Sequence, residues 1–153
     1  MRLAAGHHLG GDPVAHRAAA AAAAWLEGSA IGRHNFEDSD IVLGQGDANL
    51  ANFLWDGHRV RLVDFEDSGP SDRSFELTIL VEHLSARSDD QVDDDRFLAL
   101  FDLTTAERAR LLQYRRLAAL FWLMVLRPGG LASHRDPHGA LRRQAERLIA
   151  LLS

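Results

Sequence analysis

Three oxygen-bearing side chains in the first half of the chain have types and spacing suited to holding a divalent cation beside a proton acceptor. Asp47 follows a short apolar run, Asn52 comes five residues later, and Asp64 ends another apolar run. Mg²⁺ prefers such hard oxygen ligands, usually takes one or two carboxylates, and completes its shell with water and phosphate. A second carboxylate beside the ion can accept the proton of a hydroxyl that attacks a phosphoryl group. The three residues therefore predict a phosphotransfer site, with Asn52 and Asp64 on the metal and Asp47 as the base.

A β-hairpin is the element that must position Asn52 and Asp64. The apolar segments 53–55 and 60–63 flank an Asp-Gly pair at 56–57, which is a strong signal for a tight hairpin turn. A turn at this place brings the outer ends of both strands together. We therefore expect Asn52 and Asp64 to face each other across the hairpin, at about 5 Å.

Two stretches around these residues resemble the catalytic core of the aminoglycoside phosphotransferase and choline kinase-like family. The family pattern is H-G-D-x-x-x-x-N-x-L, a short hairpin, and then I-D-[WF]-E-x-x-x-x-G/S-D. The chain has Q-G-D-A-N-L-A-N-F-L over 45–54 and V-D-F-E-D-S-G-P over 63–70, and E-L-T over 76–78 stands where the family carries a D-L-A-like segment. The D-x-x-x-x-N spacing also occurs in protein-kinase catalytic loops, where D-F-G follows on the next hairpin. The resemblance covers about residues 42–84.

The resemblance implies a fold, an activity and a role for each matching residue. It implies an ATP-dependent phosphotransferase that acts on a hydroxyl of a small molecule, such as an aminoglycoside-like compound, a sugar or an amino alcohol. Its cofactors would be Mg²⁺ and ATP or another nucleoside triphosphate. Asp47 would be the catalytic base, Asn52 and Asp64 would bind the metal and through it the nucleotide, and Asp72 would be a structural acid near the catalytic loop. Gln45 replaces the family's His, and we expect it to hold the loop through hydrogen bonds.

The resemblance is to the C-terminal lobe of a protein-kinase-like fold, without the N-terminal lobe. The family normally clamps its nucleotide with a Lys from a β-rich N-terminal lobe, but all 17 basic residues here are Arg. The planar fork of Arg recognises phosphate differently from the point charge of Lys. Because phosphotransfer depends on preorganised charge, we expect weak or no activity from the chain alone. Rates of ~1–100 s⁻¹ for the isolated chain would contradict this expectation. A separate N-lobe chain or a second copy is an expected partner.

Composition excludes several other classes of protein. The 153 residues suit one domain, and the net charge of −5 argues against binding nucleic acid through bulk positive charge. The absence of Cys excludes a disulfide scaffold, a thiolate zinc site and a Cys nucleophile. The longest apolar run, 117–126, has ten residues, against about 20 for a membrane-spanning helix. The N-terminus lacks the apolar segment of a signal peptide, so we expect a cytoplasmic protein that binds neither membrane nor nucleic acid.

The remaining pattern predicts an α+β chain that is mainly α-helical. We expect one domain over 1–153, with a catalytic core over 42–84 and C-terminal helices over 93–152. A short buried strand is expected over 41–43, and a break in the pattern over 68–70. The expected helices are one from Asp12-Pro13 to a stop at Gly28, one capped by Asp72, a short one around 97–101, one opened by a Thr104–Glu107 capping box and buried in its second half, and one that starts at Asp136-Pro137.

Less specific interpretations remain beside these. Asp47 alone could be a turn residue and Asn52 a hydrogen-bonding residue at a strand edge. Glu66 and Asp67 are better explained as a solvated acidic loop, and 89–95 as a solvated acidic linker. The alternative to an enzyme is a non-catalytic kinase-like remnant that serves as a binding or dimerisation module. Metal titration with a nucleotide distinguishes the two.

Overall fold

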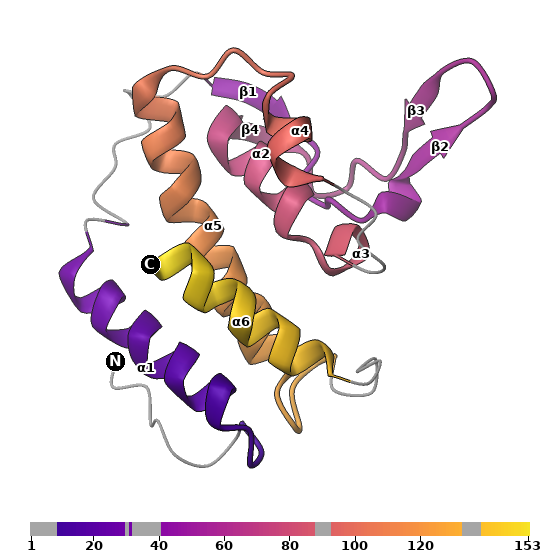
Figure 1. The fold of residues 1–153 in the computed structure, drawn as a ribbon. Coiled ribbons are helices and arrows are strands. Elements are labelled where there is room, and N and C mark those ends of the chain that lie inside the picture. Colours follow the sequence, from indigo (N-terminus) through magenta and orange to yellow (C-terminus); the bar gives the residue numbers. More distant parts are fainter. Residues whose placement is uncertain (1–8, 30, 32–40, 88–92, 133–138) are drawn as a thin grey trace. The chain divides into compact units, whose positions relative to one another are not determined.

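The computed structural model describes residues 9–29, 31, 41–87, 93–132 and 139–153 (Figure 1). These residues are mainly helical and include two small antiparallel sheets, β1 with β4 and β2 with β3, as an α+β chain requires. The helices are α1 (Pro13–Gly28), the 3₁₀ helix η2 (Leu50–Asn52), α2 (Arg73–Glu82), α3 (Leu84–Arg87), α4 (Asp94–Leu98), α5 (Thr105–Leu126) and α6 (Ala140–Leu152). The strands are β1 (Ile41–Gly44), β2 (Phe53–Trp55), β3 (Val60–Leu62) and β4 (Gly69–Asp72).

The chain forms two compact units. The terminal unit comprises Met1–Arg33 and Arg116–Ser153, and the central unit comprises His34–Arg115. The boundary falls inside α5, so the first half of that helix belongs to the central unit and the second half to the terminal unit. A single domain over 1–153 stays a prediction.

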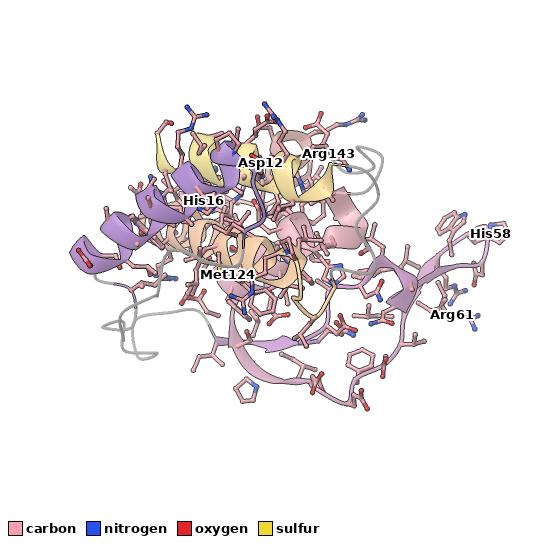
Figure 2. All side chains as sticks on the ribbon, turned by 90° about the horizontal axis from the view of Figure 1, so that it is seen from below. Asp12, His16, His58, Arg61, Met124 and Arg143 are labelled. Carbon is pink, nitrogen blue, oxygen red and sulfur yellow. The ribbon has the colours of Figure 1, made fainter. Side chains whose placement is uncertain are left out.

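In the terminal unit, α1 packs against α6 through small side chains. Ala15, Ala18 and Ala22 are 0% exposed, and their spacing of three and four residues puts them on one face of the helix. Asp12, labelled at the start of α1 in Figure 2, caps the helix by accepting hydrogen bonds from the first backbone N–H groups. The predicted start of this helix at Asp12-Pro13 and its predicted stop at Gly28 are confirmed. The opposing core side chains include Leu120, Leu123, Ala145 and Leu148.

The central unit has its own apolar core and a set of ion pairs whose carboxylates are buried. Leu77 and Val81 of α2 pack with residues of α4 and α5. Around them, Asp72 pairs with Arg110 at 3.0 Å. The other pairs with a buried carboxylate join Arg73 to Glu107, Arg87 to Asp94, and Arg115 to Glu82 and Asp94.

The two ion pairs of Asp94 correct the interpretation of 89–95 as a solvated linker. Residues 89–92 lie outside the described part of the chain, but Asp94 is only 9% exposed and forms ion pairs with Arg87 and Arg115. Asp93 caps α4 by accepting the backbone N–H of Arg96 at 3.0 Å. Residues 93–95 therefore begin a helix and anchor it.

The strand over 41–44 forms where expected but is not buried. Ile41 is 63% exposed and Leu43 is 76% exposed. The strand pairs with β4, with Leu43 opposite Pro70 and Gly44 opposite Gly69, although Ser68-Gly69-Pro70 predicted only a break. Proline is tolerated in an edge strand because its missing N–H is not needed there, and both strands of a two-stranded sheet are edges.

The prediction for the second half of α5 also needs correction. The second half of α5 is not buried all round, because Leu117 is 38% exposed and Phe121 is 55% exposed. The last helix begins at Ala140, after Gly139 in the left-handed conformation (φ 86°). The start that we expected at 136–137 lies outside the described residues.

No helix in the described ranges combines the length and apolar character needed to cross a membrane.

The capping box at the start of α5 forms and predicts a pH effect. The Thr104 N–H donates to Glu107 at 2.7 Å and the Glu107 N–H donates to Thr104 Oγ1 at 3.2 Å. The Thr104 N–H, followed by the Thr104 hydroxyl and the charge of Arg73, holds the pKa of Glu107 below its ordinary value of 4.5, against the effect of burial.

We therefore expect ionised Glu107 to stabilise the central unit above pH 4.5, and this stabilisation to be lost as the pH falls through the lower folded-state pKa. Urea unfolding over a pH series should give a difference between wild type and Glu107→Gln that shrinks in acid. The exposed Glu146→Gln is the control. A difference that stays constant from neutral to acid pH would contradict the assignment.

Candidate active site

The hairpin expected to carry the site is present. β2 and β3 pair antiparallel, with Trp55 opposite Val60. Asp56 Oδ1 closes the loop by accepting the backbone N–H groups of His58 and Arg59, both at 3.0 Å. Figure 2 labels His58 at the tip of the hairpin.

The register of the hairpin differs by one residue from our expectation. Phe53 lies opposite Leu62, and the Val63 N–H donates to the backbone oxygen of Asn52 at 3.0 Å. Asn52 is thus opposite Val63, and Asp64 follows one position later. The loop of four residues between Trp55 and Val60 fixes this register.

Asp64 leaves the strand in an unusual backbone conformation. Its φ of 61° makes it the one non-glycine residue with positive φ in the described ranges. This left-handed region is unfavourable for most residues, although Asp tolerates it better than most. Such strain often marks functional sites. The Asp64 side chain is exposed.

Asp47 and Asn52 are in direct contact. Asn52 is 8% exposed, and its Nδ2 donates to Asp47 Oδ2 at 3.0 Å. The other oxygen, Asp47 Oδ1, accepts the backbone N–H of Asn49 at 3.1 Å. The single turn of η2 makes the contact possible because it turns the chain back toward Asp47 within five residues. The amide nitrogen of Asn52 is engaged with Asp47, so its amide oxygen is the atom suited to ligate a cation.

Gln45 connects the Asp47 loop to the end of the hairpin. Its Oε1 accepts the Asp47 N–H at 2.9 Å, and its Nε2 donates to the backbone oxygens of Asp64 at 2.7 Å and Val63 at 3.2 Å. The expectation that Gln45 holds the loop through hydrogen bonds is confirmed by these contacts. The contacts also bring the backbone segments of Asp47 and Asp64 together.

Glu76 of α2 holds the start of the loop through hydrogen bonds. Its Oε2 accepts the Gln45 N–H at 3.2 Å and its Oε1 accepts the Ser71 hydroxyl at 2.6 Å. Gly44 makes room for this carboxylate, because a Cβ at Gly44 would overlap Glu76 Oε1. The E-L-T match pointed to Glu76, but its partners could not be predicted from the motif.

Asp72 is a structural residue whose carboxylate forms an ion pair with Arg110 of α5. It is 3% exposed, caps α2 through the Ser74 N–H at 2.8 Å, and accepts Arg110 Nε at 3.0 Å and the Tyr114 hydroxyl at 3.3 Å. Burial, and then the negative charge of Asp72, raise the pKa of Tyr114.

Sequence reasoning missed a pair of residues beside the loop, His83 and Ser85. Ser85 Oγ accepts the Leu50 N–H at 2.9 Å. Burial lowers the pKa of His83, and the nearby negative charge of Asp47 opposes that effect. A lone His more than thirty residues after Asp47 gave no signal in the sequence.

Glu66 and Asp67 are exposed, as a solvated loop requires.

The donor set suits Mg²⁺. The described residues contain no group of three or more His, Asp or Glu side chains that could hold a metal ion by themselves. A carboxylate at Asp64 and an amide oxygen at Asn52 are the small protein contribution that Mg²⁺ takes when water and phosphates complete its shell. The residues present therefore fit a magnesium–nucleotide complex.

Comparison with known proteins identifies a family. The family model APH, the phosphotransferase enzyme family, matches residues 2–114. No curated protein and no solved structure matches the chain. The family match includes the loop of Asp47, the hairpin, Asp64 and α2, and it covers well over half of the sequence. The chain therefore belongs to the phosphotransferase enzyme family.

Proposed function

We propose that the chain is the helical, C-terminal-lobe part of an ATP-dependent phosphotransferase that acts on a hydroxyl of a small molecule. In this proposal Asp47 is the catalytic base, and Asn52 and Asp64 hold Mg²⁺ and through it the phosphates. The observation that carries the proposal is the linkage of all three residues. Asn52 Nδ2 contacts Asp47 Oδ2, and Gln45 joins the Asp47 N–H to the Asp64 backbone oxygen.

The hydrogen bonds of Asp47 are compatible with a role as base. Each of its two carboxylate oxygens accepts one hydrogen bond, from Asn49 and from Asn52. A carboxylate offers about four acceptor positions, so further positions remain for the hydroxyl of a substrate. The two bonds fix the orientation of the carboxylate.

In the proposal, Asn52 and Asp64 act on the phosphates through the metal. When bound, Mg²⁺ would neutralise charge on the phosphoryl oxygens. The contact with Asp47 orients the Asn52 amide, and the backbone of Asp64 leaves the hairpin with a positive φ. The substrate class stays that of the family resemblance: aminoglycoside-like compounds, sugars or amino alcohols. We further propose that the chain alone has weak or no activity, because the sequence has no Lys to clamp the nucleotide.

A titration tests the metal site. With Mg²⁺ or Mn²⁺ present, wild-type chain should bind ATP saturably in calorimetry, and omission of the metal should remove binding. Asp64→Ala should abolish the metal-dependent binding of ATP, because one of the two proposed protein ligands and its negative charge are lost. Asp95→Ala, which removes an exposed carboxylate from α4, is the matched control and should bind like wild type.

Two outcomes would count against the proposal. Metal-dependent binding that persists in Asp64→Ala would exclude Asp64 as a ligand. No binding by wild type at millimolar ATP would favour the alternative of a non-catalytic remnant that acts as a binding or dimerisation module.

A further inference from the structure

The backbone of the Asp47 loop is held by side chains, one of which comes from a distant part of the chain. The N–H groups of three successive residues, Asn49, Leu50 and Ala51, donate to Asp47 Oδ1, Ser85 Oγ and Asn49 Oδ1 at 3.1, 2.9 and 3.1 Å. The first and third acceptors belong to the loop itself. Ser85 lies 35 residues later, in α3, so its bond fixes the loop relative to the rest of the central unit.

His83 determines which way the Ser85 hydroxyl points. The Ser85 N–H donates to His83 Nδ1 at 3.1 Å, and Ser85 Oγ lies 2.7 Å from the same nitrogen. Since Nδ1 accepts the backbone N–H, it carries no proton, and the hydroxyl donates to it. The lone pairs of Ser85 Oγ are then directed to the Leu50 N–H. The result is a chain of donors from Leu50 through Ser85 to His83, with His83 as the neutral Nε2–H tautomer.

The same histidine lies in the electric field of Asp47. The carboxylate of Asp47 acts on the charge of His83, and burial of the ring outweighs that effect and lowers the His83 pKa. A neutral ring beside Asp47 leaves the negative charge of the carboxylate available for a substrate hydroxyl. A cationic ring would compete for it.

We propose that His83 and Ser85 are positioning residues that hold the backbone from Asp47 to Asn52 in the geometry that binds the magnesium–nucleotide complex. This inference rests on the proposed function for its purpose, and on the hydrogen bonds of Leu50, Ser85 and His83 for its geometry. The alternative is that His83 only caps α3, since the Ala86 and Arg87 N–H groups also donate to its backbone oxygen.

Amide hydrogen exchange on the full chain, followed by NMR, tests the geometry. In Ser85→Ala the Leu50 amide should exchange roughly 2- to 10-fold faster, the range expected for one lost hydrogen bond. His83→Ala should do the same. His83→Asn should restore protection, because the Asn oxygen can accept the Ser85 N–H as in a side-chain cap. Ser29→Ala is the matched control, since it removes a comparable bond from Ser29 Oγ to the Leu26 oxygen in the terminal unit.

Two further measurements separate positioning from simple capping. The ¹⁵N shifts of the wild-type His83 ring should show an unprotonated Nδ1 near neutral pH. In Ser85→Ala and His83→Ala the metal-dependent affinity for ATP should fall by about the same factor as the Leu50 protection, and His83→Asn should recover it.

Unchanged exchange at Leu50 in both alanine variants would overturn the proposal. Faster exchange at Leu50 together with unchanged ATP affinity would also overturn it, because His83 would then only cap α3. If wild type binds no ATP, the proposed function fails, whereas the exchange and tautomer results still decide whether His83 and Ser85 hold the loop.

Discussion

Replacing Arg115 by Met should lower the free energy of unfolding of the central unit by about 3–5 kcal/mol, the cost of breaking a buried ion pair from one side. The Arg115 side chain is 11% exposed and its Nε lies 2.7 Å from Glu82 Oε1, while its Nη2 pairs with Asp94. Glu82 is 0% exposed and Asp94 is 9% exposed. Without Arg115, two carboxylates stay in a site that water reaches poorly and have lost a shared cation.

The measurement is urea unfolding combined with hydrogen exchange of the α2 amides, which reports on the central unit. Arg142→Met is the control, since the Arg142 and Glu146 side chains of its ion pair are 58% and 55% exposed. Such an exposed pair within one helix contributes at most about 0.5 kcal/mol. Glu82→Gln added to Arg115→Met should recover part of the loss by removing a buried charge. Equal costs for Arg115→Met and Arg142→Met would show that the buried pair contributes nothing specific.

The parts of the fold that the sequence predicts correctly are the parts with local signals. Asp12-Pro13 specifies the start of α1, because the cap and the fixed φ of proline act within one turn. The capping box of Thr104 and Glu107 does the same for α5. The Asp-Gly pair at 56–57 specifies the hairpin, because its geometry closes the chain over a few residues.

The parts that could not be predicted depend on contacts between distant residues. β4 contains Gly69 and Pro70, which disfavour strands on their own, and it forms because 41–44 lies alongside it. Burial of Asp94 depends on Arg115, 21 residues later. An acidic segment in sequence carries no sign of which carboxylate will find a buried cation.

In the candidate site, too, the features with local sequence signals were predicted and those that depend on distant contacts were not. The motif identifies Asp47, Asn52 and Asp64, because their spacing follows from a loop and a hairpin that are both local. Their assigned roles stay predictions. The motif did not give the one-residue shift that places Asn52 opposite Val63, because the register depends on the loop between the strands. The motif also did not predict the hydrogen bond from the Leu50 N–H to Ser85 Oγ, because α3 and the loop are distant in sequence and come into contact only in the folded unit.

Gly46→Ala should damage both the stability of the central unit and the candidate metal site. Gly46 has a φ of 85°, and a Cβ there would lie 2.5 Å from the backbone oxygen of Asp67 and 3.0 Å from its carbonyl carbon. The left-handed backbone alone costs an alanine about 1–2 kcal/mol, and forcing backbone atoms apart adds about 1–3 kcal/mol. The displaced atoms belong to the segment after Asp64 on one side and to the Asp47 loop on the other.

Gly57→Ala separates the two costs, because Gly57 also has a positive φ (97°) but a Cβ there would have no heavy atom within 4 Å. Gly57→Ala should therefore cost only about 1–2 kcal/mol of backbone strain in urea unfolding and leave metal-dependent ATP binding unchanged. Gly46→Ala should unfold at lower urea than Gly57→Ala and lose metal-dependent binding at ATP concentrations that saturate wild type. If both variants unfold alike and bind alike, then the close approach of Gly46 to Asp67 does not constrain the loop. In that case the loop would reach its geometry through its hydrogen bonds, among them those of Gln45 and Ser85, without the close approach to Asp67.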